Sequence, residues 1–216
     1  MNNADGFAAK LTSGVGNVFR GCIAYSNIDD GWDLFTKIES GPIGAVVIED
    51  CIAFRNGSLS DGSGNGDGNG FKLGGDGIAV PHVLRDSVAY ANGASGITSN
   101  SNPAIILENN IVYGNANYNL ALYGKGDEAR MFQVRGIISL DGVAPDNIKE
   151  MPELAAPYNY FWNGAASINS LGQKLDASIF EHVDIKKMPS RHPDGSIDRG
   201  GLFTLVPGTN LTHKNP

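Results

Sequence analysis

An eight-residue string recurs along the chain, and its copies share one order of residue types. The copies read RGCIAYSN at 20–27, EDCIAFRN at 49–56, RDSVAYAN at 85–92 and ENNIVYGN at 108–115, with a weaker copy, VRGIISLD, at 134–141. In the four strong copies an Ile or Val at the fourth position and an aromatic residue at the sixth give the alternation that is typical of a strand. A string that recurs along the chain in this way indicates stacked turns of a solenoid.

A second frame, in which a polar residue is followed by Gly and an aromatic residue, alternates with the first string. It occurs at Gly6-Phe7, Gly31-Trp32 and Gly70-Phe71, continues as Gly96-Ile97 and is altered at Asn119-Leu120. Gly6 and Gly31 are 25 residues apart, which suits one solenoid turn, whereas the interval from Gly31 to Gly70 also holds an insertion at 57–68. Two strand types per turn, stacked in register, predict a parallel β-helix.

Asparagine and cysteine recur at fixed positions of the strong copies. Each copy ends on asparagine, at Asn27, Asn56, Asn92 and Asn115. Because asparagine tolerates left-handed backbone and can hydrogen-bond a stacked neighbour, we predict an asparagine ladder at one corner. Cys22 and Cys51 also match, and stacked turns could join them in a disulfide. We favour the alternative that they are two small apolar residues stacked in the core.

Composition and the extent of the repeats define the expected fold class. Of the 216 residues 29 are Gly, and only 18% are charged, which favours a turn-rich β architecture. The repeats fade from about Asp141. We therefore expect β-helix turns that carry the functional site at 1–140, and one or more further turns with an irregular capping tail at 141–216. Because the chain opens on Asn3-Ala4-Asp5-Gly6, inside the first repeat, we expect an all-β solenoid truncated at its N-terminus.

The charge balance restricts the classes of partner. A net charge of −7 and a pI of about 5.0 argue against a nucleic-acid partner. No apolar run approaches the roughly 18 residues that span a bilayer, so no membrane segment is expected. The N-terminus shows no basic segment followed by an apolar one, and no signal peptide is visible. An acidic ligand remains compatible with this charge if a cation lies between ligand and protein.

Four aspartates gather in the first two copies of the Gly-aromatic frame. Asp5 and Asp30 precede equivalent glycines, Asp29 precedes Asp30, and Asp33 follows Trp32. Adjacent turns of a stacked sheet lie about 4.8 Å apart, so these carboxylates repel one another unless a cation lies among them. Turn propensity explains D-G sequences but does not explain Asp33. Hard oxygen ligands in this pattern predict a Ca²⁺ site formed by Asp5, Asp29, Asp30 and Asp33.

Lys72 occupies, one turn later, the position equivalent to Asp33. Its neighbours Phe71 and Leu73 are expected in the core, so Lys72 should project from the same face as the aspartates. It could form an ion pair with Asp33, which is a purely structural role. It could also act as a general base if burial and a bound divalent cation lower its pKa.

The insertion carries a rival calcium motif. Asp61, Ser63 and Asn65 match the first ligand positions of an EF-hand loop, but the position that requires Glu is Lys72 and no flanking helices are expected. We therefore reject an EF-hand and interpret the insertion as a flexible loop near the site that could contact a ligand.

The site segments resemble polysaccharide lyase family 9, the pectate lyases and related enzymes. The segments that carry the resemblance are NADGF at 3–7, NVFRGCIAYSNIDDGWDL at 17–34 and NGFKLGG at 69–75, within an agreement that covers about residues 3–125. The resemblance implies a right-handed parallel β-helix and a catalytic Ca²⁺ held by Asp5, Asp29, Asp30 and Asp33, with Lys72 as the Brønsted base. It further implies β-elimination on an acidic polysaccharide, above all polygalacturonate (pectate), and hence a secreted, extracellular protein. Family members carry many more turns before the first aspartate.

Two other functions are compatible with the same residues. The first is a lyase that acts on another uronate polymer, such as rhamnogalacturonan, because the sequence does not reveal the groove residues that choose the polymer. The second is a non-catalytic or vestigial β-helix that binds glycan and uses calcium as a structural clamp. Lys72 favours the enzyme, since a structural clamp needs no base.

Overall fold

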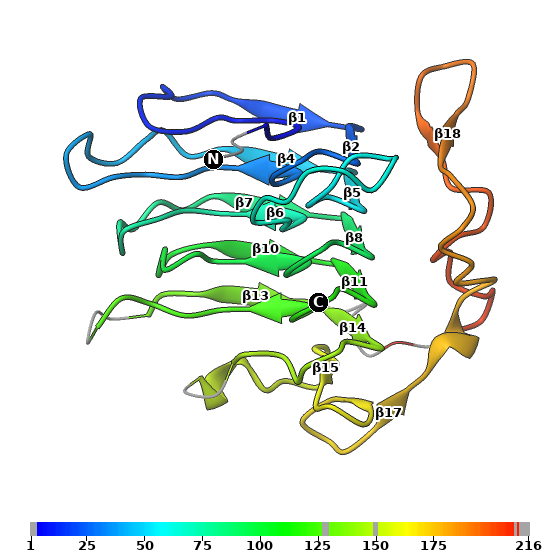
Figure 1. Ribbon diagram of the computed structural model, residues 1–216. Helices are drawn as coiled ribbons and strands as arrows, with labels where there is room; N and C mark the ends of the chain where they lie inside the picture. The colour runs from blue at the N-terminus through cyan, green and yellow to red at the C-terminus, as the bar shows by residue number, and fades with distance from the viewer. Residues whose placement is uncertain (1–3, 127–129, 149–150, 210, 212–216) are drawn as a thin grey trace.

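A computed structural model describes residues 4–126, 130–148, 151–209 and 211 of the chain. It confirms the prediction of an all-β protein built as a parallel β-helix, seen in Figure 1 as turns stacked from the blue to the green end of the chain. Three parallel sheets run along this stack, and strands that neighbour one another in a sheet come from successive turns. Asn3, the first residue of the NADGF segment, lies outside the described residues.

The strands of the three sheets are short. The first sheet contains β1 (Val18–Arg20), β4 (Val47–Glu49), β7 (Val83–Arg85), β10 (Ile106–Glu108) and β13 (Gln133–Arg135). The second contains β2 (Ile23–Tyr25), β5 (Ile52–Phe54), β8 (Val88–Tyr90), β11 (Ile111–Tyr113) and β14 (Ile138–Leu140). The third contains β3 (Trp32–Asp33), β6 (Phe71–Lys72), β9 (Ile97–Thr98) and β12 (Leu120–Ala121).

The pairing register follows the repeated strings. Equivalent residues of the strings are paired across turns, as in Ile23 with Ile52 and Ile52 with Val88. The asparagine ladder is present at the corner after the second sheet. Side-chain amide donors meet amide acceptors at 2.8 Å from Asn27 to Asn56, 2.9 Å from Asn56 to Asn92 and 2.9 Å from Asn92 to Asn115. The ladder supplies polar partners inside a corner that excludes water.

Close packing against this ladder explains the glycine of the second frame. A Cβ atom at Gly31 would lie 2.5 Å from the carbonyl oxygen of Gly70 and 2.9 Å from the side-chain nitrogen of Asn56. The equivalent Gly70 meets the carbonyl oxygen of Gly96 and the amide of Asn92 at similarly short distances. The frame therefore needs glycine because backbone and ladder approach too closely for any side chain.

Two apolar cores lie on opposite sides of the second sheet. Inside the helix, Trp32 stacks between Phe7 and Phe71 with ring centroids 4.7 and 4.8 Å apart, and small residues such as Ala53 complete the interior. The Ile/Val and aromatic residues of the repeated string lie on the opposite face of the second sheet, outside the β-helix. They form a second core that is covered from outside by the C-terminal part of the chain, including Phe203.

The C-terminal region continues the last turn and then runs back along the side of the helix (Figure 1). It contains η1 (Pro152–Leu154), the antiparallel strands β15 (Phe161–Trp162), β16 (Ser167–Ile168) and β17 (Lys174–Leu175), then η2 (Ala177–Ile179) and the hairpin of β18 (Ser190–Arg191) and β19 (Ile197–Asp198). Arg191 donates a hydrogen bond of 2.9 Å to the carbonyl oxygen of Gly21, which fastens the hairpin to an early turn. The tail thus covers the second core.

The matched cysteines are free thiols in the structure. Cys51 is fully buried in the inner core, and its sulfur lies 3.3 Å from the backbone nitrogen of Cys22 on the preceding turn. Burial raises the pKa of the Cys51 thiol to about 12, so this thiol stays protonated at neutral pH. Across the described part of the chain, no helix has the length and hydropathy needed to cross a membrane.

We expect Gly31→Ala to destabilise the protein by about 2–3 kcal/mol, because the added methyl group overlaps backbone that has no room to move. Urea unfolding followed by circular dichroism measures the effect. Gly14→Ala is the matched control, since a Cβ there meets no atom within 4 Å. Equal midpoints for the two variants would contradict the packing explanation of the frame.

Candidate active site

The third sheet sets Asp33 and Lys72 side by side on adjacent turns. Asp33 pairs in register with Lys72, just as Trp32 pairs with Phe71. Phe71 and Leu73 are fully buried, whereas the Lys72 side chain keeps 12% of its surface exposed. Strand alternation therefore turns Lys72 out of the core and onto the face that carries the aspartates, as the sequence predicts.

Asp5 and Asp30 form a second polar ladder along the start of this sheet. Asp5 Oδ1 accepts a hydrogen bond of 3.3 Å from the backbone N–H of Asp30, and Asp30 Oδ1 accepts one of 2.8 Å from the N–H of Asn69. Asn69 Oδ1 in turn accepts from the N–H of Ser95. In each of these two aspartates, Oδ1 accepts a backbone hydrogen bond from the next turn, and the second oxygen, Oδ2, is available to other partners.

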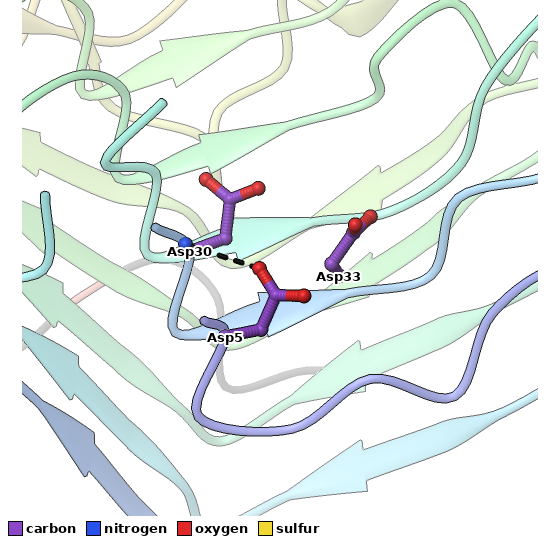
Figure 2. Close-up of side chains that lie close together, drawn as sticks. All are labelled: Asp5, Asp30 and Asp33. Atoms are coloured by element: carbon purple, nitrogen blue, oxygen red, sulfur yellow. Dashed lines mark hydrogen bonds between the residues drawn. The ribbon is translucent and has the colours of Figure 1, made fainter. Parts of the chain in front are cut away.

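The carboxylates of these two aspartates meet that of Asp33 in one small region. Carboxylate oxygens of Asp5, Asp30 and Asp33 lie within 4.8 Å of one another, and Figure 2 shows the three side chains gathered together. The side chains of Asp5, Asp30 and Asp33 are 1%, 0% and 5% exposed, respectively. Three buried carboxylates at this separation are a donor set that suits a hard divalent cation such as Ca²⁺.

Asp29 belongs to a neighbouring group. Its carboxylate gathers with those of Asp30 and Asp67, again within 4.8 Å, so Asp30 is common to both groups. Asp29 Oδ1 accepts a short hydrogen bond of 2.6 Å from the N–H of Asp67. The four aspartates of the sequence prediction are therefore close together, but they form two groups that share Asp30. Asp29 lies in the group next to the insertion, and Asp5 and Asp33 lie in the other group.

The insertion is packed against the site at its C-terminal end. A Cβ at Gly66 would lie 2.4 Å from the carbonyl oxygen of Ile28 and 2.7 Å from the Cα of Asp29. This contact brings Asp67 Oδ2 to 2.9 Å from the ammonium group of Lys72. Asp61 instead bonds to Ser63 inside the exposed part of the insertion, away from both carboxylate groups.

Two lysines neutralise part of this negative charge. The Lys72 ammonium lies 3.0 Å from Asp30 Oδ2 and 4.0 Å from Asp33 Oδ2, besides its contact with Asp67. The Lys10 ammonium lies 2.7 Å from Asp5 Oδ2 and 2.7 Å from Asp33 Oδ2. Lys10 thus bridges two of the three converging carboxylates.

The pKa values of these groups follow from burial and from their mutual charges. Burial alone would lower the pKa of Lys72, but the negative charges of Asp30 and Asp33 outweigh it and raise the pKa above its usual range. For Lys10, burial is likewise outweighed by the hydrogen bonds to Asp33 and Asp5, which raise its pKa. Burial raises the pKa of Asp30 to about 6, against the opposing effect of the Lys72 charge.

A cleft of about 580 Å³ opens over this cluster. Besides Asp5, Asp33 and Asp67, its walls carry Lys10, Lys37 and Lys72. Phe35 also lines it, with its ring centroid 5.8 Å from the Lys72 nitrogen. In an acidic protein, a cleft with three lysines beside a carboxylate cluster can accept an anionic chain that binds together with a cation.

Sequence reasoning missed Lys10 and Asp67. A signal for Lys10 was available, because Phe7 and Ala9 pack in the core and strand alternation then turns Lys10 outward, to the side of Asp33. No comparable signal exists for Asp67, since it lies in an insertion that has no counterpart in the other turns.

Fold and site together define a parallel β-helix protein with an acidic, lysine-containing site on one of its sheets. The chain belongs to the family described as "Pel9A-like, right handed beta helix region", whose model matches residues 1–129.

Named relatives agree with this membership. The chain is 50% identical over 182 residues to pectate lyase L of Thermoclostridium stercorarium, covering 83% of this chain and 14% of that protein. It is 43% identical over 212 residues to pectate lyase L of Paenibacillus polymyxa strain SC2, covering 97% of this chain and 45% of that protein. The crystal structure of pectate lyase Pel9A superposes with a TM-score of 0.68 at 31% identity, covering 96% of this chain and 48% of that structure. The chain therefore spans less than half the length of each of these relatives.

Proposed function

We propose that this chain is a calcium-dependent polysaccharide lyase that cleaves polygalacturonate by β-elimination. The observation that carries the proposal is the position of Lys72. Its ammonium is held 3.0 Å from Asp30 at the edge of a three-carboxylate cluster, and it lines a cleft that is open to solvent. Membership of the Pel9A-like family and relatives named pectate lyase support the same reaction class.

The carboxylates of Asp5, Asp30 and Asp33 would hold the calcium ion, and Asp29 would contribute from the neighbouring group, with which the first group shares Asp30. A bound divalent cation would neutralise the substrate carboxylate, acidify the proton on C5 of the sugar and offset the charge that now raises the pKa of Lys72. Backbone N–H groups of Asp30 and Asn69 donate to the Oδ1 atoms of Asp5 and Asp30, respectively, so the Oδ2 atoms have no backbone partner and are available to the cation.

Lys72 acts as the general base in this proposal. Its neutral amine accepts the C5 proton of the uronate, the C5–H electron pair becomes the C4=C5 double bond, and the glycosidic C4–O bond breaks. The leaving oxygen takes a proton from water, which gives one 4,5-unsaturated end and one new reducing end. The hydroxide that remains takes the proton from Lys72, so the amine is regenerated and no water is consumed. Asp67 contacts the amine through the exposed insertion, so it positions Lys72 above the cation site.

A bound cation would explain how an acidic protein binds an acidic polymer. Asp5, Asp33 and Asp67 line the cleft together with Lys10, Lys37 and Lys72, so the cleft walls carry both signs of charge and a divalent cation between protein and polymer would supply the additional positive charge. Because a polysaccharide of this size does not cross a cell membrane freely, we expect the protein to be secreted.

The test of the proposal is the ultraviolet absorbance of the unsaturated uronate product when the purified chain is mixed with polygalacturonate. We expect a steady rise with calcium and no rise with a chelator. A rise on rhamnogalacturonan alone would assign a different polymer. No rise on either polymer, from a chain shown by circular dichroism to be folded, would contradict the proposal and favour a glycan-binding role.

We expect Lys72→Ala to lower the rate of elimination by about 10²–10⁴-fold, the contribution of a general base, without weakening calcium binding. Initial rates and calorimetric calcium titrations measure the two quantities. Lys174→Ala, an exposed lysine of β17 outside the cleft, is the control and should keep the wild-type rate. Retained activity in Lys72→Ala would remove Lys72 from the mechanism.

We expect Asp30→Asn to weaken calcium binding at least about tenfold. The asparagine keeps an oxygen acceptor for the N–H of Asn69 but loses the charge that attracts the cation. Asp61→Asn, in the rejected EF-hand segment, is the matched control and should bind calcium as the wild type does. If the two variants have equal affinities, the cation site does not lie where we place it.

A further inference from the structure

Lys10 occupies the place in the carboxylate cluster where a cation is needed. Its ammonium nitrogen lies 2.7 Å from Asp5 Oδ2 and 2.7 Å from Asp33 Oδ2. A calcium ion sits about 2.3–2.6 Å from its carboxylate oxygens. A calcium ion bound to the same two oxygens would therefore take almost the same position as the ammonium nitrogen, and the two cations exclude one another.

We infer that Lys10 is a built-in counter-cation that holds the site together in the absence of metal and is displaced when a divalent cation binds. This inference rests on the proposed function, because it concerns the same cation site. Lys10 bridges one aspartate from each of two adjacent turns, so its single charge offsets the repulsion between carboxylates that stacking holds close together.

The surroundings of Lys10 suit a side chain that has two positions. Its side chain is 20% exposed, whereas those of its partners Asp5 and Asp33 are 1% and 5% exposed. Lys10 also lines the cleft of about 580 Å³, so the ammonium can leave the carboxylates and enter solvent without moving the backbone. The flexible four-carbon stem of lysine allows this displacement, and the carboxylates stay in place because backbone N–H groups hold Asp5 Oδ1 and Asp33 Oδ1.

Lys72 differs from Lys10 in this respect. It contacts Asp30 and Asp67 and lies 4.0 Å from Asp33, so it stands at the edge of the three-carboxylate group and does not bridge Asp5 and Asp33. One lysine is therefore placed to compete with the metal, while the other remains beside it. Competition with Lys10 lowers the calcium affinity below the value that the carboxylates alone would give. When calcium is scarce, Lys10 keeps the two buried carboxylates of Asp5 and Asp33 paired.

The test is calorimetric calcium titration of Lys10→Met, with Lys37→Met as the matched control. Lys37 is exposed, lines the same cleft and forms no ion pair with the described carboxylates, so its removal reports only the general loss of positive charge. We expect Lys10→Met to bind calcium at least about fivefold more tightly than Lys37→Met. We also expect a lower melting temperature for Lys10→Met in chelator, restored by calcium, and no such pattern for Lys37→Met.

A second measurement uses the wild-type chain and does not depend on the folding of a variant. In a nuclear magnetic resonance titration with lysine side-chain labelling, calcium should shift the Lys10 signals while the Lys37 signals stay nearly constant. Equal calcium affinities of the two methionine variants, or Lys10 signals that do not respond to saturating calcium, would overturn the inference. Elimination of polygalacturonate is measured separately, so an active lyase with an unresponsive Lys10 would overturn this inference and leave the proposed function intact.

Discussion

In-register stacking of parallel strands is the constraint on which the rest of this structure depends. Each turn places equivalent residues about one strand spacing, about 4.8 Å, above those of the turn before. Because Gly31 has no side chain, the asparagine ladder can approach the backbone closely. The ladder then supplies hydrogen-bond partners to the polar groups that are buried at this corner. Any residue type that recurs in the sequence frame therefore becomes a column in space. Apolar columns build two cores, and the polar columns build the site.

The same constraint that concentrates the carboxylates also creates their electrostatic problem. Asp5 and Asp30 come from successive turns, and Asp33 shares the face of Asp30, so their oxygens cannot separate without a break in register. Two lysines offset this repulsion, Lys10 by bridging Asp5 and Asp33 and Lys72 by its contact with Asp30 at the edge of the group. The raised pKa of Lys72 is the direct result, because the neighbouring carboxylates favour its charged form. A divalent cation would replace part of this positive charge, and a base would then be easier to generate at Lys72.

Much of this arrangement could be predicted from the sequence, because register follows from repetition. The pairing of Asp33 with Lys72 and the asparagine ladder both follow from matching the repeated frames. The functions of the aspartates and of Lys72 stay predictions.

The path of the insertion could not be predicted, since it has no repeat to align, and so Asp67 was missed. The bridge made by Lys10 depends on the conformation of a long side chain, which strand alternation alone does not fix. The C-terminal tail has no period, and so its packing on the outer face of the second sheet had to be seen in the structure.

We propose that stacking assembles carboxylates from two turns into one cation site beside Lys72. A crystal structure of the chain grown with calcium, with an anomalous difference map to locate the metal, tests it most directly. We predict one ion bound by the carboxylates of Asp5, Asp30 and Asp33, with the Lys10 ammonium withdrawn from Asp5 and Asp33. An ion bound elsewhere, for example beside Asp61 in the insertion, or no ion at saturating calcium, would contradict it.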